Sequence, residues 1–309
     1  GMSAGNYQTG GPGSSNSTST STSNSGTSTS GSYQTSGPGY SNSSSGSGSS
    51  SSGSASTTVP GGNAAGSNNH YYTNTGSMTG PGSSNVVGGQ FVFMKTQGRC
   101  VDNMAILNPA AMKAALGENP KTTYGEQGNC PATRMGEAAL LRRTLLEAVQ
   151  YQKDKERGRL DREDFEKEPW MPVFQRVIPM KVHAHRADDI LTAIRIAKEF
   201  NIDITIDHGT EAHLIVDEVK ASGFPVIVGT DLTSRSKLEV QNMNFKTNKI
   251  LAEAGVLIAV TTDHPVALIQ YLPLCAGLAV KEGLPMEEGL KAITINPAKI
   301  CRVEQRVGS

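Results

Sequence analysis

Apolar residues recur in regular spacing only after about residue 76, where strand-like and helix-like stretches alternate. Short β-branched runs predict strands, and apolar positions three or four apart predict helices. The predicted strands lie within 105–116, 177–184, 202–206, 225–228 and 256–262, and the predicted helices span 134–155, 187–200, 211–222, 248–254, 266–281 and 286–295. This alternation indicates an α/β fold with a parallel sheet.

The stretch 134–155 gives the clearest helix signal. Thr133 is a suitable N-cap, and Leu140, Leu141, Leu145 and Val149 form one apolar stripe while charged residues cover the other faces.

The first 75 residues have a different character from the rest of the chain. They are almost entirely Ser, Thr, Gly and Asn, and no Lys, Arg, Asp or Glu occurs before Lys95. Such a segment buries too little apolar area to offset its ordering entropy, so we expect it to be disordered. The sequence therefore predicts a low-complexity segment over 1–75 and one folded domain over 76–309, which is long enough for a good core.

Charge and cysteine content restrict the partners and the compartment. The 28 basic and 28 acidic residues balance, and no basic block is present to neutralise nucleic-acid phosphates. The four cysteines form no CxxC pair, and no apolar run is long enough to span a bilayer. We therefore expect a cytoplasmic protein with reduced thiols that binds neither nucleic acid nor membrane.

Residue types that bind metals stand at the ends of three predicted strands. His183 and His185 end one, His208 ends the next, and Asp263 follows the last. Residues two apart in a strand share a face, so His183 and His185 should point the same way. Taken singly, an inward histidine is more often a satisfied core residue than a ligand. Together with a carboxylate, imidazoles suit zinc or a similar divalent ion at an open catalytic site.

The ordered motifs from about Met78 onward resemble the amidohydrolase superfamily, specifically its imidazolonepropionase-like branch of metal-dependent hydrolases. The resemblance is carried by Thr79-Gly80-Pro81-Gly82-Ser83-Ser84-Asn85 with Gly88-Gly89-Gln90, Met112-Lys113 through Leu116-Gly117-Glu118-Asn119-Pro120-Lys121, Lys181-Val182-His183-Ala184-His185, Asp207-His208-Gly209, Thr262-Asp263-His264-Pro265 and Thr294-Ile295-Asn296-Pro297-Ala298. It implies a TIM-type (β/α)8 barrel that hydrolyses carbon–nitrogen bonds of amides or cyclic amides. The implied cofactor is one or two divalent metal ions, with zinc expected first and iron or manganese as alternatives.

Site residues follow from the resemblance at the matching positions. His183 and His208 would be metal ligands from the fifth and sixth barrel strands, and Asp263 would bind metal and act as the general base at the eighth. The fourth strand should supply a bridging group, for which Glu118 is favoured and Lys113 is the alternative. Lys113 has a simpler interpretation as a partly buried structural lysine.

Three further residues are assigned to substrate contact by the same resemblance. These are His185, His264 and Gln90. His264 neighbours Asp263 and faces the other way, so support of a ligand is the role we favour for it. His213 falls within a predicted helix and receives no catalytic role.

The sequence also departs from the family pattern. The family places a His-x-His pair at the end of the first barrel strand, but the only histidine before His183 is His70, in the low-complexity segment. The first two barrel strands and the small β-sandwich domain have no counterpart. We therefore expect an incomplete barrel of about six strands, whose two open edges favour a homo-oligomer.

Three functional classes remain from the sequence. The first is a metal-dependent amidohydrolase acting on a small amide or lactam through metal-activated water. The second is a catalytically impaired remnant that binds metal. The third is an interaction or display protein in which residues 1–75 act as a tether.

Overall fold

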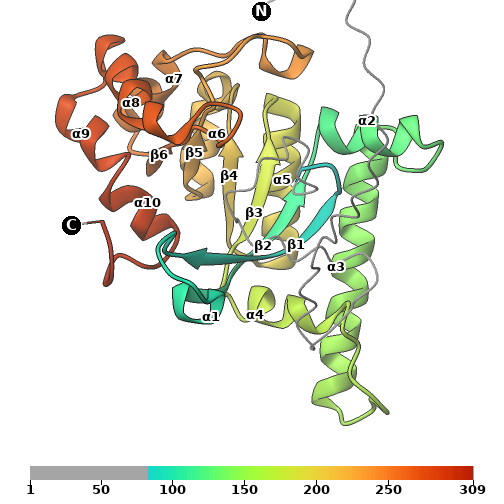
Figure 1. The fold of residues 1–309 in the computed structure, drawn as a ribbon. Helices are drawn as coiled ribbons and strands as arrows, with labels where there is room; N and C mark the ends of the chain where they lie inside the picture. Colours follow the sequence, from blue (N-terminus) through green and yellow to red (C-terminus); the bar gives the residue numbers. More distant parts are fainter. Residues whose placement is uncertain (1–82, 309) are drawn as a thin grey trace, which may run out of the picture. The chain divides into compact units, whose positions relative to one another are not determined.

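A computed structural model describes residues 83–308, which belong to one unit of the chain spanning 59–309. Within the described part the strands form one six-stranded sheet whose spatial order follows the sequence (Figure 1). The strands are β1 (Val87–Met94), β2 (Ala105–Ala115), β3 (Met180–Ala184), β4 (Ile204–His208), β5 (Val226–Val228) and β6 (Ile258–Val260). β1 pairs antiparallel with β2, and every later pair is parallel.

The two faces of the sheet differ in chemistry because strand residues alternate between them. One face is apolar and packs into the core with the helices; it carries residues such as Val182 and Ile206, both fully buried. On the other face, Lys113 pairs with Lys181 and His183 pairs with Asp207 in the strand register. The parallel sheet thus has one hydrophobic face and one face that carries the candidate chemistry.

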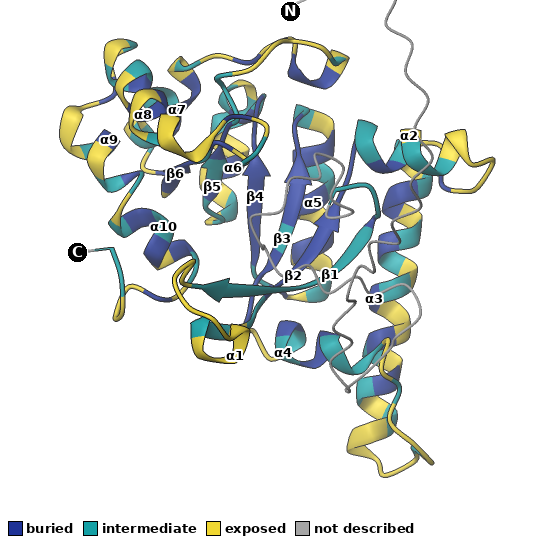
Figure 2. Cartoon of the chain, viewed as in Figure 1, coloured by how far each residue is buried: buried dark blue, intermediate teal, exposed yellow. Residues whose placement is uncertain are grey.

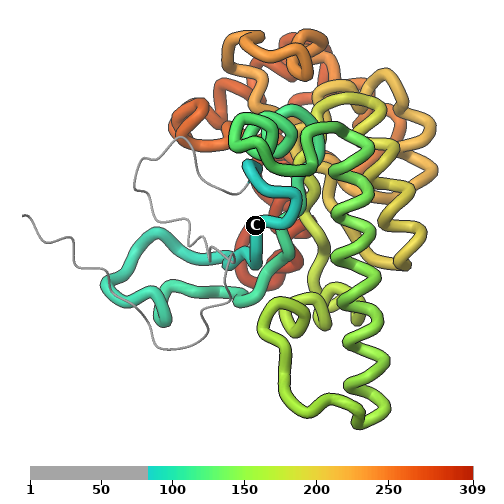
Figure 3. The backbone as a smooth tube through the Cα atoms, turned by 90° about the vertical axis from the view of Figure 1, so that its right-hand side faces the viewer, coloured from blue at the N-terminus to red at the C-terminus, as the bar shows by residue number. Residues whose placement is uncertain are grey.

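Helices cover the apolar face of the sheet (Figures 1 and 3). The helices are α1 (Val101–Met104), α2 (Glu118–Glu126), α3 (Arg134–Glu156), α4 (Met171–Phe174), α5 (Ala187–Phe200), α6 (Val216–Ser222), α7 (Lys246–Glu253), α8 (Leu272–Lys281), α9 (Met286–Lys291) and α10 (Ile295–Ile300), with 3-10 turns at Glu168–Trp170, Ala212–Ile215, Leu238–Val240 and Ile269–Tyr271. Figure 2 shows β3 to β6 and the end of β2 as mostly buried, β1 as only partly buried, and exposed residues on the outer helix surfaces.

The predicted long helix is confirmed as α3. The Thr133 hydroxyl accepts a hydrogen bond from the Gly136 amide at 3.1 Å, which is the expected N-cap interaction. Leu141 and Leu145 are fully buried within the apolar stripe, whereas Leu146 on the opposite side is exposed. α5 begins and ends at the predicted residues because its apolar face is equally regular.

The prediction was wrong or too coarse in several places. β1 and the short helices α1, α2 and α4 were missed, and the single helix expected over 286–295 is divided into α9 and α10. The helices expected over 211–222 and 266–281 are shorter, and a 3-10 turn precedes each of them. The α/β class is confirmed, but the strand pairings that join residues 83–308 run from β1 to β6 and none links β6 back to β1. A closed barrel is therefore not seen in this part of the chain.

Predictions for the N-terminal segment, including His70 and the boundary near residue 75, fall outside the described residues. Among residues 83–308, no helix combines the length and apolarity needed to cross a membrane.

Candidate active site

Three buried histidines meet at the carboxyl ends of β3 and β4. The ring of His183 lies 4.7 Å from that of His185 and 4.3 Å from that of His208, centroid to centroid. One nitrogen from each ring can be chosen so that all three atoms lie within 4.8 Å of one another. Separations of this size suit ligands of a single metal ion, and the carboxyl ends of parallel strands are where α/β folds bind ligands.

The backbone explains how His208 joins the cluster. By strand alternation His208 should share the helix-facing side with Ile206, opposite to His183. However, His208 ends β4 with φ of 75°, a left-handed conformation that is uncommon for a residue with a side chain. Strained backbone of this kind is concentrated at functional sites. Here the left-handed conformation of His208 accompanies a change in the direction of its side chain, which joins the cluster instead of following the strand alternation.

The three imidazoles are neutral at pH 7. Burial is the main cause that holds the pKa of His183 and His185 well below the usual value, and the neighbouring His208 ring and the ammonium groups of Lys113 and Lys237 lower it further. Burial also lowers the pKa of His208, while the carboxylate of Asp263 acts in the opposite direction. A neutral imidazole keeps one nitrogen lone pair free, which is the form that binds a metal ion.

Hydrogen bonds orient two of the three rings. Nδ1 of His208 lies 2.6 Å from the carbonyl oxygen of Gly229 and donates to it, which leaves Nε2 as the acceptor nitrogen. Nδ1 of His185 lies 2.7 Å from the Thr210 hydroxyl. Nδ1 of His183 is buried without a hydrogen-bond partner among the described residues. An unsatisfied buried nitrogen in a cluster of neutral imidazoles fits a divalent metal ion as the missing partner.

An ion cluster centred on Asp207, which pairs with His183 in the strand register, lies on the same face of the sheet. Asp207 accepts from Lys181 at 3.0 Å and from the Thr205 hydroxyl at 2.9 Å, and its second oxygen is 3.7 Å from Nζ of Lys113. Both ammonium groups also lie about 6 Å from the centre of the Phe91 ring. Burial lowers the pKa of Lys113, and its carboxylate neighbour partly restores it. This arrangement agrees with Lys113 as a buried structural lysine.

Glu118 is the first residue of α2, one residue beyond the Gly117 N-cap. Two buried carboxylates bind the amides at this helix start: Glu137 accepts from Gly117 at 2.8 Å and Glu239 accepts from Glu118 at 2.7 Å. These amides are among the four that a helix start leaves without intrahelical partners. Gly117 has φ of 103°, and a Cβ there would lie 2.8 Å from the Glu239 carboxylate, so the position requires glycine.

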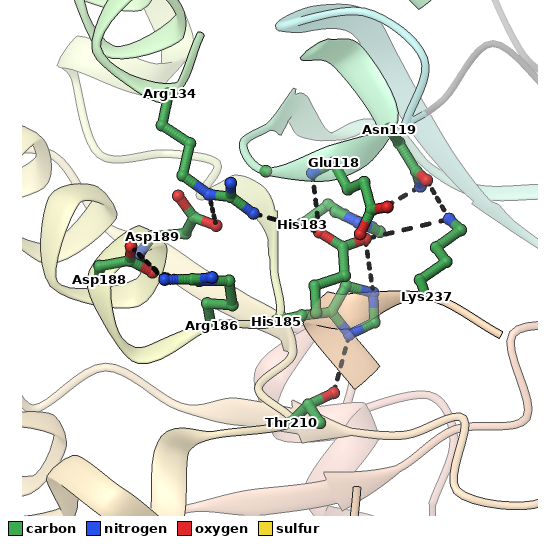
Figure 4. Close-up of polar contacts among 12 residues, drawn as sticks. Glu118, Asn119, Arg134, His183, His185, Arg186, Asp188, Asp189, Thr210 and Lys237 are labelled. Atoms are coloured by element: carbon green, nitrogen blue, oxygen red, sulfur yellow. Dashed lines mark hydrogen bonds and ion pairs between the residues drawn. The ribbon is translucent and has the colours of Figure 1, made fainter. Parts of the chain in front are cut away.

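Asn119 and Lys237 extend the site beyond the residues to which the sequence analysis gave a role (Figure 4). Nδ2 of Asn119 lies 3.4 Å from Nε2 of His183, and its Oδ1 accepts from Nζ of Lys237. Lys237 and Glu239 come from the long segment between β5 and α7. Glu239 also reaches His185, with Oε1 at 3.9 Å from Nε2.

The remaining residues that the sequence analysis discussed contact other parts of the chain or lie near the cluster without a direct contact to it. Asp263 is exposed after β6, with φ of 49°, and is close enough to act on His208 electrostatically. Nδ1 of His264 accepts from the Ile269 amide at 3.3 Å. The Gln90 amide donates to the Pro169 carbonyl at 3.1 Å, in contact with a 3-10 turn. His213 contacts the Thr247 hydroxyl at 3.0 Å on the helical side.

Sequence reasoning missed Thr210, Lys237 and Glu239. Thr210 stands two residues after His208, so a polar residue just beyond a strand end was the available signal. Glu239 lies in the 3-10 turn Leu238–Val240 and Lys237 directly precedes it, in a segment without apolar periodicity. Only the density of polar residues after β5 could have drawn attention to them.

Comparisons with known proteins concern the sequence and the fold. No protein-family profile matches the sequence. Amidohydrolase TasK of Hapsidospora irregularis is 26% identical over 262 residues, which cover 76% of this chain and 27% of that protein. The crystal structure of an amidohydrolase from Thermotoga maritima MSB8 is 42% identical, with a TM-score of 0.72 over 74% of this chain and 61% of that one. This chain thus spans less than two thirds of each relative. Over about three quarters of its length, the chain resembles the amidohydrolase superfamily in sequence and in fold.

Proposed function

We propose that this chain is a metal-dependent hydrolase that cleaves a carbon–nitrogen bond of a small amide or cyclic amide. The observation that carries the proposal is the buried cluster of His183, His185 and His208, all neutral and with ligand atoms within 4.8 Å of one another. The similarity to two amidohydrolases supports the same reaction class.

His183 and His208 are the proposed metal ligands, with Asp263 and Glu118 as the carboxylate donors. His208 is already oriented by Gly229, and His183 keeps a buried nitrogen without a partner among the described residues. We keep His185 for substrate contact, because its two ring nitrogens face Thr210 and Glu239. Zinc is the first candidate ion, and iron or manganese would suit the same nitrogen and oxygen donors.

When bound, a divalent ion lowers the pKa of water toward neutrality and polarises a carbonyl group. The chain's own contribution is proton transfer and exclusion of water. Asp263 would take the proton from the attacking water and deliver it to the leaving nitrogen, for which its exposed position just after β6 gives access. The buried imidazoles are closed off from bulk water, which strengthens electrostatic interactions with the substrate carbonyl.

Metal content per chain, measured by elemental mass spectrometry, is the first test. We expect stoichiometric zinc, iron or manganese in the parent protein and its loss in His208→Ala. His213→Ala is the matched control, since His213 lies outside the cluster and should leave metal content unchanged. Absence of metal after reconstitution would overturn the proposal.

Hydrolysis is tested next on a panel of amides and lactams. Asp263→Asn should lower kcat by about 10²- to 10⁴-fold, as expected for loss of a general base, while circular dichroism shows an unchanged fold. Retained activity in this variant would contradict the role of Asp263. The alternative function, a remnant that binds metal without catalysis, is motivated by the missing His-x-His pair upstream of His183. It predicts metal binding that depends on His208 together with no hydrolysis of any substrate.

A further inference from the structure

A cavity of about 490 Å³ lies where the segment after β5 meets the start of α7 and the end of α8. Asp231 and Arg235 line it from the segment, Phe245 and Lys246 from the start of α7, and Glu282 from the residue after α8. The three clustered histidines are not among its lining residues. A volume of this size is typical of a site for a small organic molecule.

Asp231 is a carboxylate in this cavity that has no counterion within the described part of the chain. Its one side-chain hydrogen bond is long, from Nδ2 of Asn248 at 3.5 Å. Burial raises the pKa of Asp231 to about 7, and no neighbouring cation acts to lower it. A positively charged group bound in the cavity would supply the missing charge and stabilise the carboxylate.

Asn248 provides a second unsatisfied acceptor beside Asp231. The residue is 1% exposed in α7, and its Oδ1 has no hydrogen-bond partner among residues 83–308. Buried polar atoms are rarely left without a partner. A primary ammonium group carries three N–H donors, so a single one can serve both the Asp231 carboxylate and the Asn248 oxygen.

Arg235 is the unpaired cation of the same cavity. Its Nη2 donates to the Met243 carbonyl at 2.8 Å, which anchors the guanidinium, and it forms no ion pair with a described carboxylate. A guanidinium has five N–H donors, so those that remain can bind a carboxylate. Lys246 and Glu282, in contrast, face each other with Nζ and Oε2 3.9 Å apart. The lining therefore contains one negative and one positive group that lack partners.

We propose that this cavity binds a small α-amino acid with an apolar side chain, with the ammonium at Asp231 and Asn248 and the carboxylate at Arg235. Phe245 and Met243 also line the cavity and offer apolar surface for the side chain. Such a zwitterion pairs both charged groups at once, whereas an amine or a carboxylic acid alone leaves one of them without a partner. The site shares no residue with the proposed hydrolase centre, so the inference is independent of that function.

The test compares L-leucine with two analogues that each lack one charge, 3-methylbutylamine and 4-methylpentanoate. Binding is measured by isothermal titration calorimetry at about pH 8, where most of the Asp231 carboxyl is ionised. Asp231→Asn and Arg235→Met each remove one charge, and Arg235→Lys retains the positive one. Asp217→Asn, at an exposed position in the first turn of α6, is the matched control.

We expect the parent protein to bind one L-leucine per chain, at least about 10-fold more tightly than either analogue, the effect of a charge-assisted hydrogen bond. Asp231→Asn should weaken leucine binding by about 10-fold or more and abolish the advantage over 4-methylpentanoate, because the ammonium loses its partner. Arg235→Met should abolish the advantage over 3-methylbutylamine, and Arg235→Lys should recover most of it. Asp217→Asn should resemble the parent.

No binding of L-leucine to the parent at millimolar concentration would overturn the site, and so would equal affinity for all three compounds. Because an amino acid can also bind a metal ion, His208→Ala is titrated in parallel. Binding that is lost in His208→Ala but unchanged in Asp231→Asn would assign leucine to the histidine cluster and refute the proposal. Arg235 is exposed, so Arg235→Met gives the same test if Asp231→Asn disturbs the fold.

Discussion

Glu137 offers a sharp test of the electrostatics around the start of α2. Its side chain is fully buried, one oxygen accepts the Gly117 amide at 2.8 Å, and the other has no hydrogen-bond partner among the described residues. Burial is the main cause that raises the pKa of Glu137 from 4.5 to about 7, and the carboxylates of Asp189 and Glu239 add to it. Glu137→Gln keeps the size and the amide acceptor but removes the ionisable group.

The direction of the pH dependence of stability follows from the number of protons that the folded and the unfolded protein bind. Between pH 4.5 and about 7 the folded protein keeps the Glu137 proton while the unfolded chain has lost it, so this residue makes stability fall as pH rises through that window. A shift of this size corresponds to about 3 kcal/mol at most. Solvent screening and relaxation of Arg134 reduce it, so we expect a loss of about 1–3 kcal/mol.

Urea unfolding followed by circular dichroism at pH 4.5, 5.5, 6.5, 7.5 and 8.5 measures the effect. The free energy of unfolding of Glu137→Gln relative to the parent should increase by about 1–3 kcal/mol from the lowest to the highest pH. Glu147→Gln, an exposed position on the same helix, should show a difference that does not change with pH. If Glu137→Gln also gives a constant difference, the carboxylate ionises equally in both states and the reasoning is refuted.

Two further changes test packing with the same unfolding assay. Leu145→Ala truncates a fully buried side chain and should lower the free energy of unfolding by about 2–5 kcal/mol. Leu146→Ala, at the 57% exposed neighbouring position, should lower it by less than about 0.5 kcal/mol. Similar losses in the two variants would mean that α3 packs through another face. Gly209→Ala places a Cβ 2.5 Å from Cγ1 of Val226, at a residue whose φ is 52°. It should destabilise the folded protein by about 2 kcal/mol or more. An unchanged free energy of unfolding would contradict the close contact between Gly209, after β4, and Val226 in β5.

The sequence predicted those elements whose local pattern and tertiary environment agree. α5 was predicted to the residue because its apolar positions follow one helical face that is buried along its whole length. β1 was missed because Gly88 and Gly89 weaken the strand pattern, and its antiparallel pairing with β2 is a tertiary feature. α2 was missed because Asn119-Pro120 is typical of a turn.

The candidate site was predictable in part for the same reason. Strand alternation places His183 and His185 together, and the parallel arrangement brings the end of β4 beside them. The left-handed conformation of His208 and the reach of Lys237 and Glu239 depend on contacts between residues far apart in the sequence. No local pattern encodes such contacts, so these parts of the site could be found only in three dimensions.

The order of the sheet has a consequence for how the chain acquires its site. Each strand pairs with its neighbour in sequence, so the sheet can grow from β1 to β6 with modest loop-closure entropy at every step. The link from Glu239 to Glu118 instead closes a loop of 121 residues and requires β5 to be in place. We therefore expect the helices and the early strands to form before the hydrogen bond between Glu239 and the start of α2. The chain would then become able to bind its ligand only late in folding.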